Sequence, residues 1–272
     1  MSGPRVAAIQ MTTGADVADN LEQAGTLIAE AADRGALVAA LPENFAFMGH
    51  RDVDKRAVAE PEGAGPIQEF LSGSARRHRL MVIGGTMPIA IPGGDGRVAA
   101  ASLVFDADGQ RVGRYDKIHL FDVDLPSAAE TYRESAHVAP GGRVQLLDTP
   151  AGRLGMAVCY DIRFPELFRR LSAQGADWFV LPSAFTVPTG EAHWETLLRA
   201  RAIENLAFVV APAQSGRHAN GRLTYGDTMI VDYWGRVLAR RPSGPGCVVA
   251  EFDCAAQADA RLHFPALRHR TL

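Results

Sequence analysis

Short apolar runs alternate along the chain with segments of helical periodicity, and this alternation restricts the fold more than any other feature. The apolar runs have the length and composition of buried strands. They comprise residues 5–11, 36–43, 81–89, 177–184 and 208–214. The helical patterns, in which apolar side chains share one stripe, cover residues 17–34, 65–80 and 190–207. Helices that alternate with strands in this way predict a layered α/β architecture.

Other stretches are typical of antiparallel hairpins, so the sheets are expected to be mixed rather than purely parallel. Residues 101–117 carry a turn at Asp108-Gly109, and residues 144–160 carry one at Pro150–Gly152. Residues 229–240 repeat the strand–turn–strand pattern.

The composition is that of a globular protein with enough apolar material for an extensive core. Of the 272 residues, 47% are apolar and 22% are charged. The net charge of −3, without a basic stripe, argues against a nucleic-acid partner. No apolar run approaches a membrane span, and the N-terminus lacks a signal-peptide pattern, so we expect a cytoplasmic protein without membrane contact. Because no linker or repeat divides the chain, we expect one domain over residues 1–272, with a core of about 4–252 and a tail of about 253–272.

The cysteines do not form a disulfide framework or a zinc site. Cys159, Cys247 and Cys254 are an odd number in a long chain, and no pair has CxxC spacing. We therefore ask whether one of them has a chemical role.

Cys159 lies where an apolar strand pattern meets a helix pattern that begins at Pro165. A helix N-terminus near a thiol lowers its pKa and helps to hold it as thiolate. The backbone N–H of Tyr160, the next residue, is placed to donate to an oxyanion. The alternative is a buried structural thiol, because free cysteine is among the most buried residue types.

Two charged residues follow other strand patterns and are candidate partners of this thiol. Glu43, in LPENF, ends a buried strand, where open α/β sheets place their chemistry. Apolar surroundings there raise the pKa of a carboxyl toward neutrality. Lys117 follows another strand, and its ammonium is suited to stabilise a developing oxyanion. The alternatives are a structural ion pair for Glu43 and a solvated surface position for Lys117.

Together, the blocks around these residues resemble the nitrilase superfamily of carbon–nitrogen hydrolases. LPENF, YDKIHLFDVDLP with YRES, and GMAVCYDIRFPELFRRLSAQGAD occur in that family's order. Two further blocks, PSAFTVPTGEAHWETLLRARAIEN and VVAPAQSGRH, are similar to the branch of deaminated glutathione amidases and ω-amidases. The resemblance runs from about residue 4 to the C-terminus. It implies a four-layer α-β-β-α sandwich with two mixed sheets, and a homo-oligomer, a dimer or larger, that pairs through helices near the active-site edge.

The resemblance also implies a role for each matching residue. Cys159 is the nucleophile, Glu43 is the general base and later acid, and Lys117 stabilises the tetrahedral intermediate together with the Tyr160 N–H. Glu134, in YRES, matches a glutamate that orients the lysine and the substrate. No metal and no organic cofactor is implied.

The implied function is an amidase that converts a small carboxylate-bearing amide, deaminated glutathione or a similar 2-oxo-amide, to acid and ammonia through a cysteine thioester. An ω-amidase, a nitrilase or a carbamoylase with the same triad remains an alternative. A non-catalytic interaction module on the same fold is a third reading, which the loss of a triad residue would have favoured. A zinc hydrolase finds no support, because no His, Cys or Asp group has ligand spacing.

Specificity depends on residues outside the triad. Arg163 is placed to receive a substrate carboxylate through a bidentate contact, or to pair with Asp161 or Glu166 instead. Phe185 and Thr186 follow a strand and are expected at the mouth of the pocket.

Some residues depart from the branch pattern or invite another reading. Asp227 stands where a histidine is expected, Tyr233 where a proline is usual, and Gly142 where an aspartate is common. We expect the Asp227 change to affect a subunit contact or a nearby loop. His119 and His193 suggest a cysteine–histidine pair, but neither lies in the expected signature context, and His119 is expected to pack beside the lysine loop.

Overall fold

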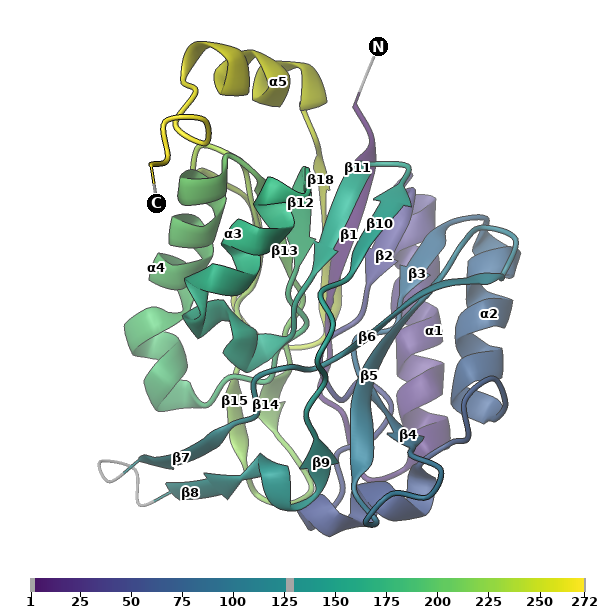
Figure 1. Cartoon of the computed structure of the whole chain (residues 1–272). Helices are drawn as coiled ribbons and strands as arrows, with labels where there is room; N and C mark the ends of the chain where they lie inside the picture. Colours follow the sequence, from purple (N-terminus) through teal and green to yellow (C-terminus); the bar gives the residue numbers. More distant parts are fainter. Residues whose placement is uncertain (1–2, 126–129, 272) are drawn as a thin grey trace.

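The computed structural model describes residues 3–125 and 130–271, and it folds into two β-sheets stacked face to face between outer helices (Figure 1). The predicted four-layer α-β-β-α arrangement with two mixed sheets is confirmed. In the described part of the chain, no helix is long and apolar enough to cross a membrane.

The first sheet has the strand order β18-β1-β2-β3-β5-β4, and β6 and β9 also pair with β5. Strands β1, β2 and β3 run parallel. β18 pairs antiparallel with β1, β5 pairs antiparallel with β3, and β4 and β6 pair antiparallel with β5. The strands are β1 (Arg5–Gln10), β2 (Val38–Ala40), β3 (Met81–Ile83), β4 (Met87–Ala90), β5 (Val98–Phe105), β6 (Arg111–Asp116), β9 (Val138–Ala139) and β18 (Gly246–Glu251).

The second sheet has the order β10-β11-β12-β13-β16-β17, with β11, β12 and β13 parallel. Its strands are β10 (Leu146–Thr149), β11 (Gly152–Met156), β12 (Trp178–Val180), β13 (Phe208–Ala211), β16 (Thr228–Val231) and β17 (Val237–Arg241). Two small antiparallel ribbons stand outside the sheets: β7 (Asp122–Leu125) with β8 (Glu130–Arg133), and β14 (Ser215–Arg217) with β15 (Leu223–Tyr225).

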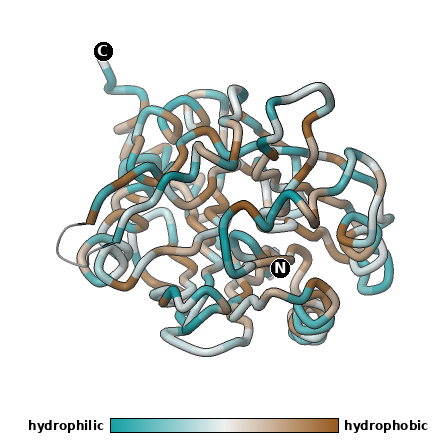
Figure 2. Tube along the Cα trace, turned by 90° about the horizontal axis from the view of Figure 1, so that it is seen from below, coloured by the Kyte–Doolittle hydropathy of each residue, from teal (hydrophilic) through white to brown (hydrophobic). Residues whose placement is uncertain are grey.

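Helices α1 (Val17–Asp33) and α2 (Pro66–His78) cover the first sheet, and α3 (Pro165–Ala173) and α4 (Val187–Asn205) cover the second (Figure 1). The side chain of Asp16 caps α1 by accepting from the Asp19 N–H, and α2 and α3 begin at prolines, whose missing N–H costs nothing in a first turn. Along the helical coils in Figure 2, hydrophobic and hydrophilic stretches alternate, as the sequence periodicity predicts.

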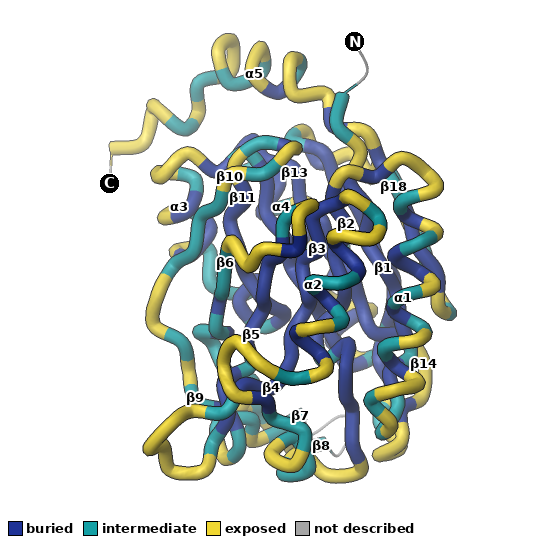
Figure 3. Tube along the Cα trace, turned by 90° about the vertical axis from the view of Figure 1, so that its right-hand side faces the viewer, coloured by how far each residue is buried: buried dark blue, intermediate teal, exposed yellow. Residues whose placement is uncertain are grey.

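The alternation of side chains along β1 connects the layers. Ala7 and Ile9 belong to the core beneath α1 and α2, whereas Val6 and Ala8 belong to the core that joins the two sheets. A strand with apolar residues on both faces suits a central position, because both faces are removed from water. Figure 3 shows the central strands buried between more exposed helices.

Three of the parallel strands, β2, β12 and β13, are shorter than their apolar runs, because a proline follows each of them. β2, β12 and β13 end two or fewer residues before Pro42, Pro182 and Pro212. Proline has no N–H to donate to a ladder, so the chain leaves the sheet there as a buried loop. The run at 81–89 also divides, at Gly84-Gly85, where a side chain on Gly85 would collide with the carbonyl of Pro42.

In the segment predicted as a tail, the structure has helix α5 (Cys254–His263). Gln257 donates from one nitrogen to the carbonyls of Asp177 and Leu206, and Arg261 forms an ion pair with Asp177. The helix therefore closes the end of the second sheet, on the side away from β7 and β8 (Figure 1).

Candidate functional site

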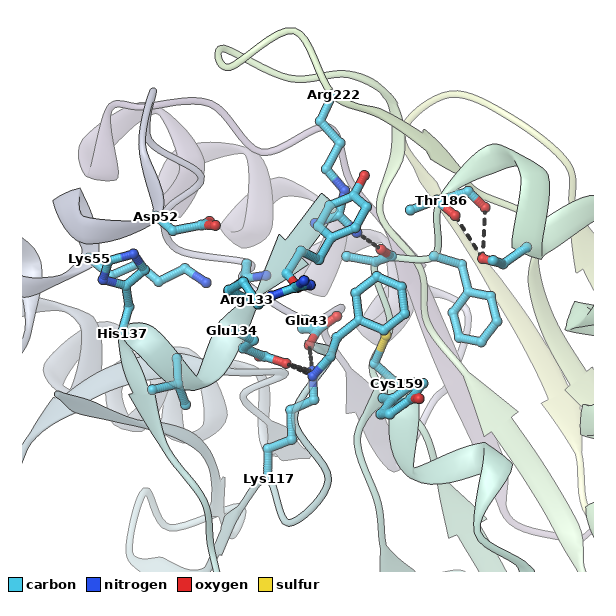
Figure 4. A pocket seen from close by; sticks show the side chains of 18 of the residues that line it. Glu43, Asp52, Lys55, Lys117, Arg133, Glu134, His137, Cys159, Thr186 and Arg222 are labelled. Carbon is cyan, nitrogen blue, oxygen red and sulfur yellow. Dashed lines mark hydrogen bonds and ion pairs between the residues drawn. The ribbon is translucent and has the colours of Figure 1, made fainter. Parts of the chain in front are cut away.

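Glu43, Lys117 and Cys159 lie together at the ends of strands from both sheets (Figure 4). Glu43 follows β2 by the loop Leu41-Pro42, Lys117 follows β6 directly, and Cys159 follows β11 and begins the 3-10 turn η4 (Cys159–Arg163). All three line one pocket, although they are far apart in the chain.

Lys117 is buried between two carboxylates. Its Nζ donates to Glu43 Oε1 at 2.8 Å and to Glu134 at 2.8 and 3.0 Å. Glu134 belongs to the turn η3 (Glu134–Ala136), and it also accepts from the Phe121 N–H at 2.7 Å. Burial opposes the ammonium charge, but Glu134 and Glu43 raise the pKa of Lys117 well above its ordinary value. Lys117 is therefore a fixed positive charge, and the surface reading does not apply.

The Glu43 carboxylate is held in its charged form. Burial alone would raise its pKa, but the charge of Lys117 and the hydrogen bonds from Lys117 and Cys159 lower the pKa below 4.5. The prediction of a raised pKa was wrong, because it considered the apolar surroundings without the lysine.

Cys159 is a neutral thiol in this arrangement. Burial, followed by the charge of Glu43, raises the pKa of the thiol far above 9.0, and the opposing charge of Lys117 is smaller. The expectation that a helix N-terminus lowers this pKa was therefore wrong. A charged carboxylate near a neutral thiol is a base that is able to accept the thiol proton.

The backbone at Cys159 has the left-handed conformation, with φ of 47°. Its N–H donates to the Pro182 carbonyl at 2.9 Å, which anchors the turn to the loop after β12. No acceptor among the described residues takes the N–H of Tyr160, so this donor remains available to a bound oxygen.

Asp161 joins the cysteine turn to the lysine strand. Its buried carboxylate accepts from the Tyr115 hydroxyl at 2.7 Å, from His119 through N–H at 3.0 Å and Nδ1 at 2.7 Å, and from the Val158 N–H at 2.8 Å. Tyr115 and His119 flank Lys117 in the chain, and Val158 precedes Cys159. The predicted packing of His119 beside the lysine loop agrees with this contact, and its ring also stacks on Phe164.

Arg163 lines the pocket and pairs with neither Asp161 nor Glu166. Its guanidinium lies 5.8 Å from the ring centre of Tyr160 and 5.5 Å from that of Phe185, and it contacts His193 at 3.3 Å. Phe185 and the buried Thr186 line the same pocket. Arg163 is therefore open to an anionic ligand.

Arg222, which no sequence pattern singles out, also lines the pocket. It lies in the turn between β14 and β15, donates from Nη2 to the Ala184 carbonyl at 2.5 Å, and stands 5.0 Å from the ring centre of Tyr132. Nothing in the segment RHANGRLTYG distinguishes this arginine from an exposed loop residue, because its partners are distant in the chain.

The departures from the branch pattern lie outside the pocket lining. The buried Asp227 forms an ion pair with Arg240 at 2.6 and 2.9 Å, and its carbonyl accepts from Trp194 Nε1. Tyr233 packs its ring edge against Phe208. Asp227 thus connects β17 to α4 within the chain.

Comparison with known proteins places this site in a family. The carbon-nitrogen hydrolase family model matches residues 5–261. A deaminated glutathione amidase of Yersinia enterocolitica is 41% identical over 269 residues, which cover 99% of this chain and 93% of the relative.

Solved structures of related proteins have the same fold as this chain. The crystal structure of the C. elegans NitFhit protein matches with a TM-score of 0.90 and 36% identity over 100% of this chain, which spans 66% of that longer chain. A variant of the amidase from Nesterenkonia sp. AN1 matches with a TM-score of 0.82 and 26% identity, over 99% of this chain and 94% of that one. In that structure the acetamide moiety of fluoroacetamide is covalently added at the active site cysteine.

The chain belongs to the carbon–nitrogen hydrolase family, the nitrilase superfamily, as its sequence blocks predict. Within that family it is an enzyme of the amidase type.

Proposed function

We propose that this enzyme hydrolyses a small carboxylate-bearing amide, deaminated glutathione or a similar 2-oxo-amide, through a thioester on Cys159. The observation that carries the proposal is the 2.8 Å ion pair of Glu43 with Lys117 in a pocket that Cys159 and Arg163 also line. The similarity to deaminated glutathione amidases supports the substrate class.

In the first step, Glu43 takes the proton of Cys159 and the sulfur attacks the amide carbonyl. Protonation removes the charge of Glu43, so its hydrogen bond with Lys117 weakens and one Nζ–H turns toward the forming oxyanion. The Tyr160 N–H supplies a second donor, and Glu134 keeps Lys117 in place.

In the second half of the reaction, Glu43 returns its proton to the leaving nitrogen, and the carbon–nitrogen bond breaks to give a thioester. Glu43 then takes a proton from water, whose oxygen attacks the thioester. The carbon–sulfur bond breaks, Glu43 returns the proton to the Cys159 sulfur, and the acid is released. A primary amide releases ammonia. Deaminated glutathione, in which both amide nitrogens are substituted, releases an amine, so ammonia detection alone would miss it.

The test measures amine release from deaminated glutathione and ammonia release from 2-oxoglutaramate. We expect Cys159→Ala to lose hydrolysis by at least about 10³-fold, as removal of a nucleophile does. Cys254→Ala, which changes an exposed cysteine, is the matched control and should retain full activity. Hydrolysis that survives in Cys159→Ala would rule out the thioester.

We also propose a homo-oligomer, supported by exposed apolar side chains near the C-terminal end. Trp234 is 49% exposed and Phe264 is 54% exposed, with ring centres 5.7 Å apart, and Ile203 contacts Gly235 beside them. Sedimentation of the wild type and of Trp234→Lys should show association that the variant weakens.

We further propose a cytoplasmic location. The free thiols support it, because a reducing compartment keeps Cys159 reactive.

A further inference from the structure

Two arginines stand at the ends of a row of aromatic rings in the pocket. Arg163 lies over Tyr160, whose ring meets Phe121 edge-on at 5.1 Å between centres. Phe121 lies 5.0 Å from Tyr132, and Arg222 stands over Tyr132 at 5.0 Å. Because all five residues line the same pocket, this row is a continuous apolar wall with a guanidinium at each end.

Neither arginine has an acidic partner. In the described part of the chain, no carboxylate lies within 4.0 Å of the nitrogens of Arg163 or Arg222. By contrast, Lys117 is held by Glu43 and Glu134, and Arg133, another residue of the pocket, is held by Asp124. The two guanidiniums are the charges in this aromatic row that remain available to a ligand.

The Arg222 guanidinium is held in place by two neighbours, and one of its N–H groups has no hydrogen-bond acceptor among the described residues. The Ala184 carbonyl takes one Nη2–H, and the Tyr132 ring supports one face. Its Nε is buried and has no hydrogen-bond partner among the described residues. A buried guanidinium N–H without an acceptor is costly, and a ligand anion that neutralises the group and shifts its neighbours would relieve that cost.

We propose that Arg222 receives a second substrate carboxylate, so that the enzyme prefers amides with a carboxylate on each side of the scissile bond. This inference rests on the proposed function. Arg163 shares the turn η4 with Cys159, and it takes the carboxylate of the acyl part that stays on the sulfur. Arg222 comes from the separate β14–β15 ribbon on the opposite side of the pocket from Lys117 in Figure 4, and it takes the carboxylate of the amine part that leaves.

The chemistry of the ligand follows from the order of groups along the wall, in which aromatic rings separate two guanidiniums. A compact amide with one carboxylate contacts Arg163 through that carboxylate and leaves Arg222 without an anionic ligand. An elongated amide with two terminal carboxylates, such as deaminated glutathione, reaches both and lays its middle against Phe121 and Tyr132. A thioether or thiol in that middle part is compatible with aromatic contact.

The experiment compares kcat/KM for deaminated glutathione and for its C-terminal carboxamide, in which the far carboxylate is neutral. The wild type should prefer the free acid by about 10- to 100-fold, the usual effect of a charge-assisted hydrogen bond. In Arg222→Gln this ratio should fall toward one, and Arg222→Lys should restore part of it. The charge of Arg222 also acts on Glu43, but that effect applies to both substrates and cancels in the ratio.

Arg217→Gln is the matched control, because Arg217 lies on the same ribbon, is exposed and does not line the pocket. It should keep the wild-type ratio. Equal losses on both substrates in Arg222→Gln, with an unchanged ratio, would assign Arg222 a merely structural role and overturn the proposal.

A binding measurement separates this inference from the proposed function. By calorimetry, Cys159→Ala should bind deaminated glutathione about 10- to 100-fold more tightly than the carboxamide, and addition of Arg222→Gln should remove the difference. Preferential binding without hydrolysis by the wild type would support Arg222 and contradict the proposed function. Equal binding of the two compounds, or binding of neither, would overturn the assignment of Arg222.

Discussion

The Tyr115 hydroxyl donates to Asp161 across 2.7 Å, and this contact ties the strand that leads to Lys117 to the turn that begins with Cys159. Both side chains are buried, and their positions in the chain differ by 46 residues. The distance between Cys159 and Lys117 therefore depends on a hydrogen bond that neither of these two residues makes.

Removal of this hydroxyl should weaken both the fold and the reaction. Tyr115→Phe leaves the buried Asp161 with one donor fewer, so we expect a loss of about 1–3 kcal/mol in the free energy of unfolding, and a lower kcat. Denaturant unfolding and steady-state kinetics measure these. Tyr233→Phe, which removes a hydroxyl without a partner among the described residues, should change stability by less than about 0.5 kcal/mol. Equal effects of the two substitutions would contradict a special role for the Tyr115 contact.

Replacement of Lys117 by methionine should destabilise the protein in a pH-dependent manner. The substitution leaves the carboxylates of Glu43 and Glu134 buried without their counter-charge, which costs about 3–5 kcal/mol at neutral pH. The pKa of Glu43 in the wild type is lowered, so the wild type gains stability from this group above pH 4.5 and loses it as the pH falls through the lower folded value. In Lys117→Met that stabilisation is absent, so the difference in unfolding free energy should shrink on acidification. A difference that stays constant from neutral to acidic pH would contradict the charge argument.

The pH profile of kcat/KM should be flat between 4.5 and 9.0, the ordinary pKa values of the two reacting groups. Glu43 is active as carboxylate, and its lowered pKa moves the acidic limb below 4.5. The raised pKa of Cys159 moves thiol ionisation above 9.0. Rates measured with a substrate that does not titrate in this range test the prediction. A limb near pH 7 would show that Glu43 or Cys159 ionises near neutral pH, which would contradict the lowered pKa of Glu43 or the raised pKa of Cys159.

The ion pair between Asp227 and Arg240 should stabilise the chain without touching the chemistry. The pKa of Arg240 is raised, first by its hydrogen bond to Asp227, so the guanidinium keeps its charge. Asp227→Asn should lower the melting temperature and leave the substrate preference of the enzyme unchanged. An altered ratio of kcat/KM between deaminated glutathione and 2-oxoglutaramate would instead connect this site to specificity.

The layers and the hairpins could be predicted from local patterns, and the candidate triad from the resemblance of three sequence blocks to those of the family. Strand length, turn residues and the LPENF-type blocks are each contained within a few positions, so Glu43, Lys117 and Cys159 could be selected before their convergence was seen. The ends of β2 and β12 were predicted less accurately, because the apolar run in the sequence continues past a proline at which the hydrogen-bonded ladder has already ended.

Properties that depend on a distant neighbour could not be predicted. Lys117 lowers the pKa of Glu43, whereas burial and the charge of Glu43 raise the pKa of Cys159, and the positions of these groups relative to one another are fixed only by the packing of two sheets. Arg222 escaped attention for the same reason, since Ala184 and Tyr132, which give it its place, lie on other elements.

Because Arg222 lies on the β14–β15 ribbon, the residue proposed to set substrate preference is on a different element from the residues proposed to carry out the reaction. Glu43, Lys117 and Cys159 depend on both sheets, so a lineage can alter them only by disturbing the core. The ribbon from Ser215 to Tyr225 lies outside both sheets, and Arg222 is the residue of this ribbon that lines the pocket. Descendants of this chain are therefore free to exchange one amide for another by small changes in a short ribbon, and a library confined to it is the economical starting point for redirecting the enzyme.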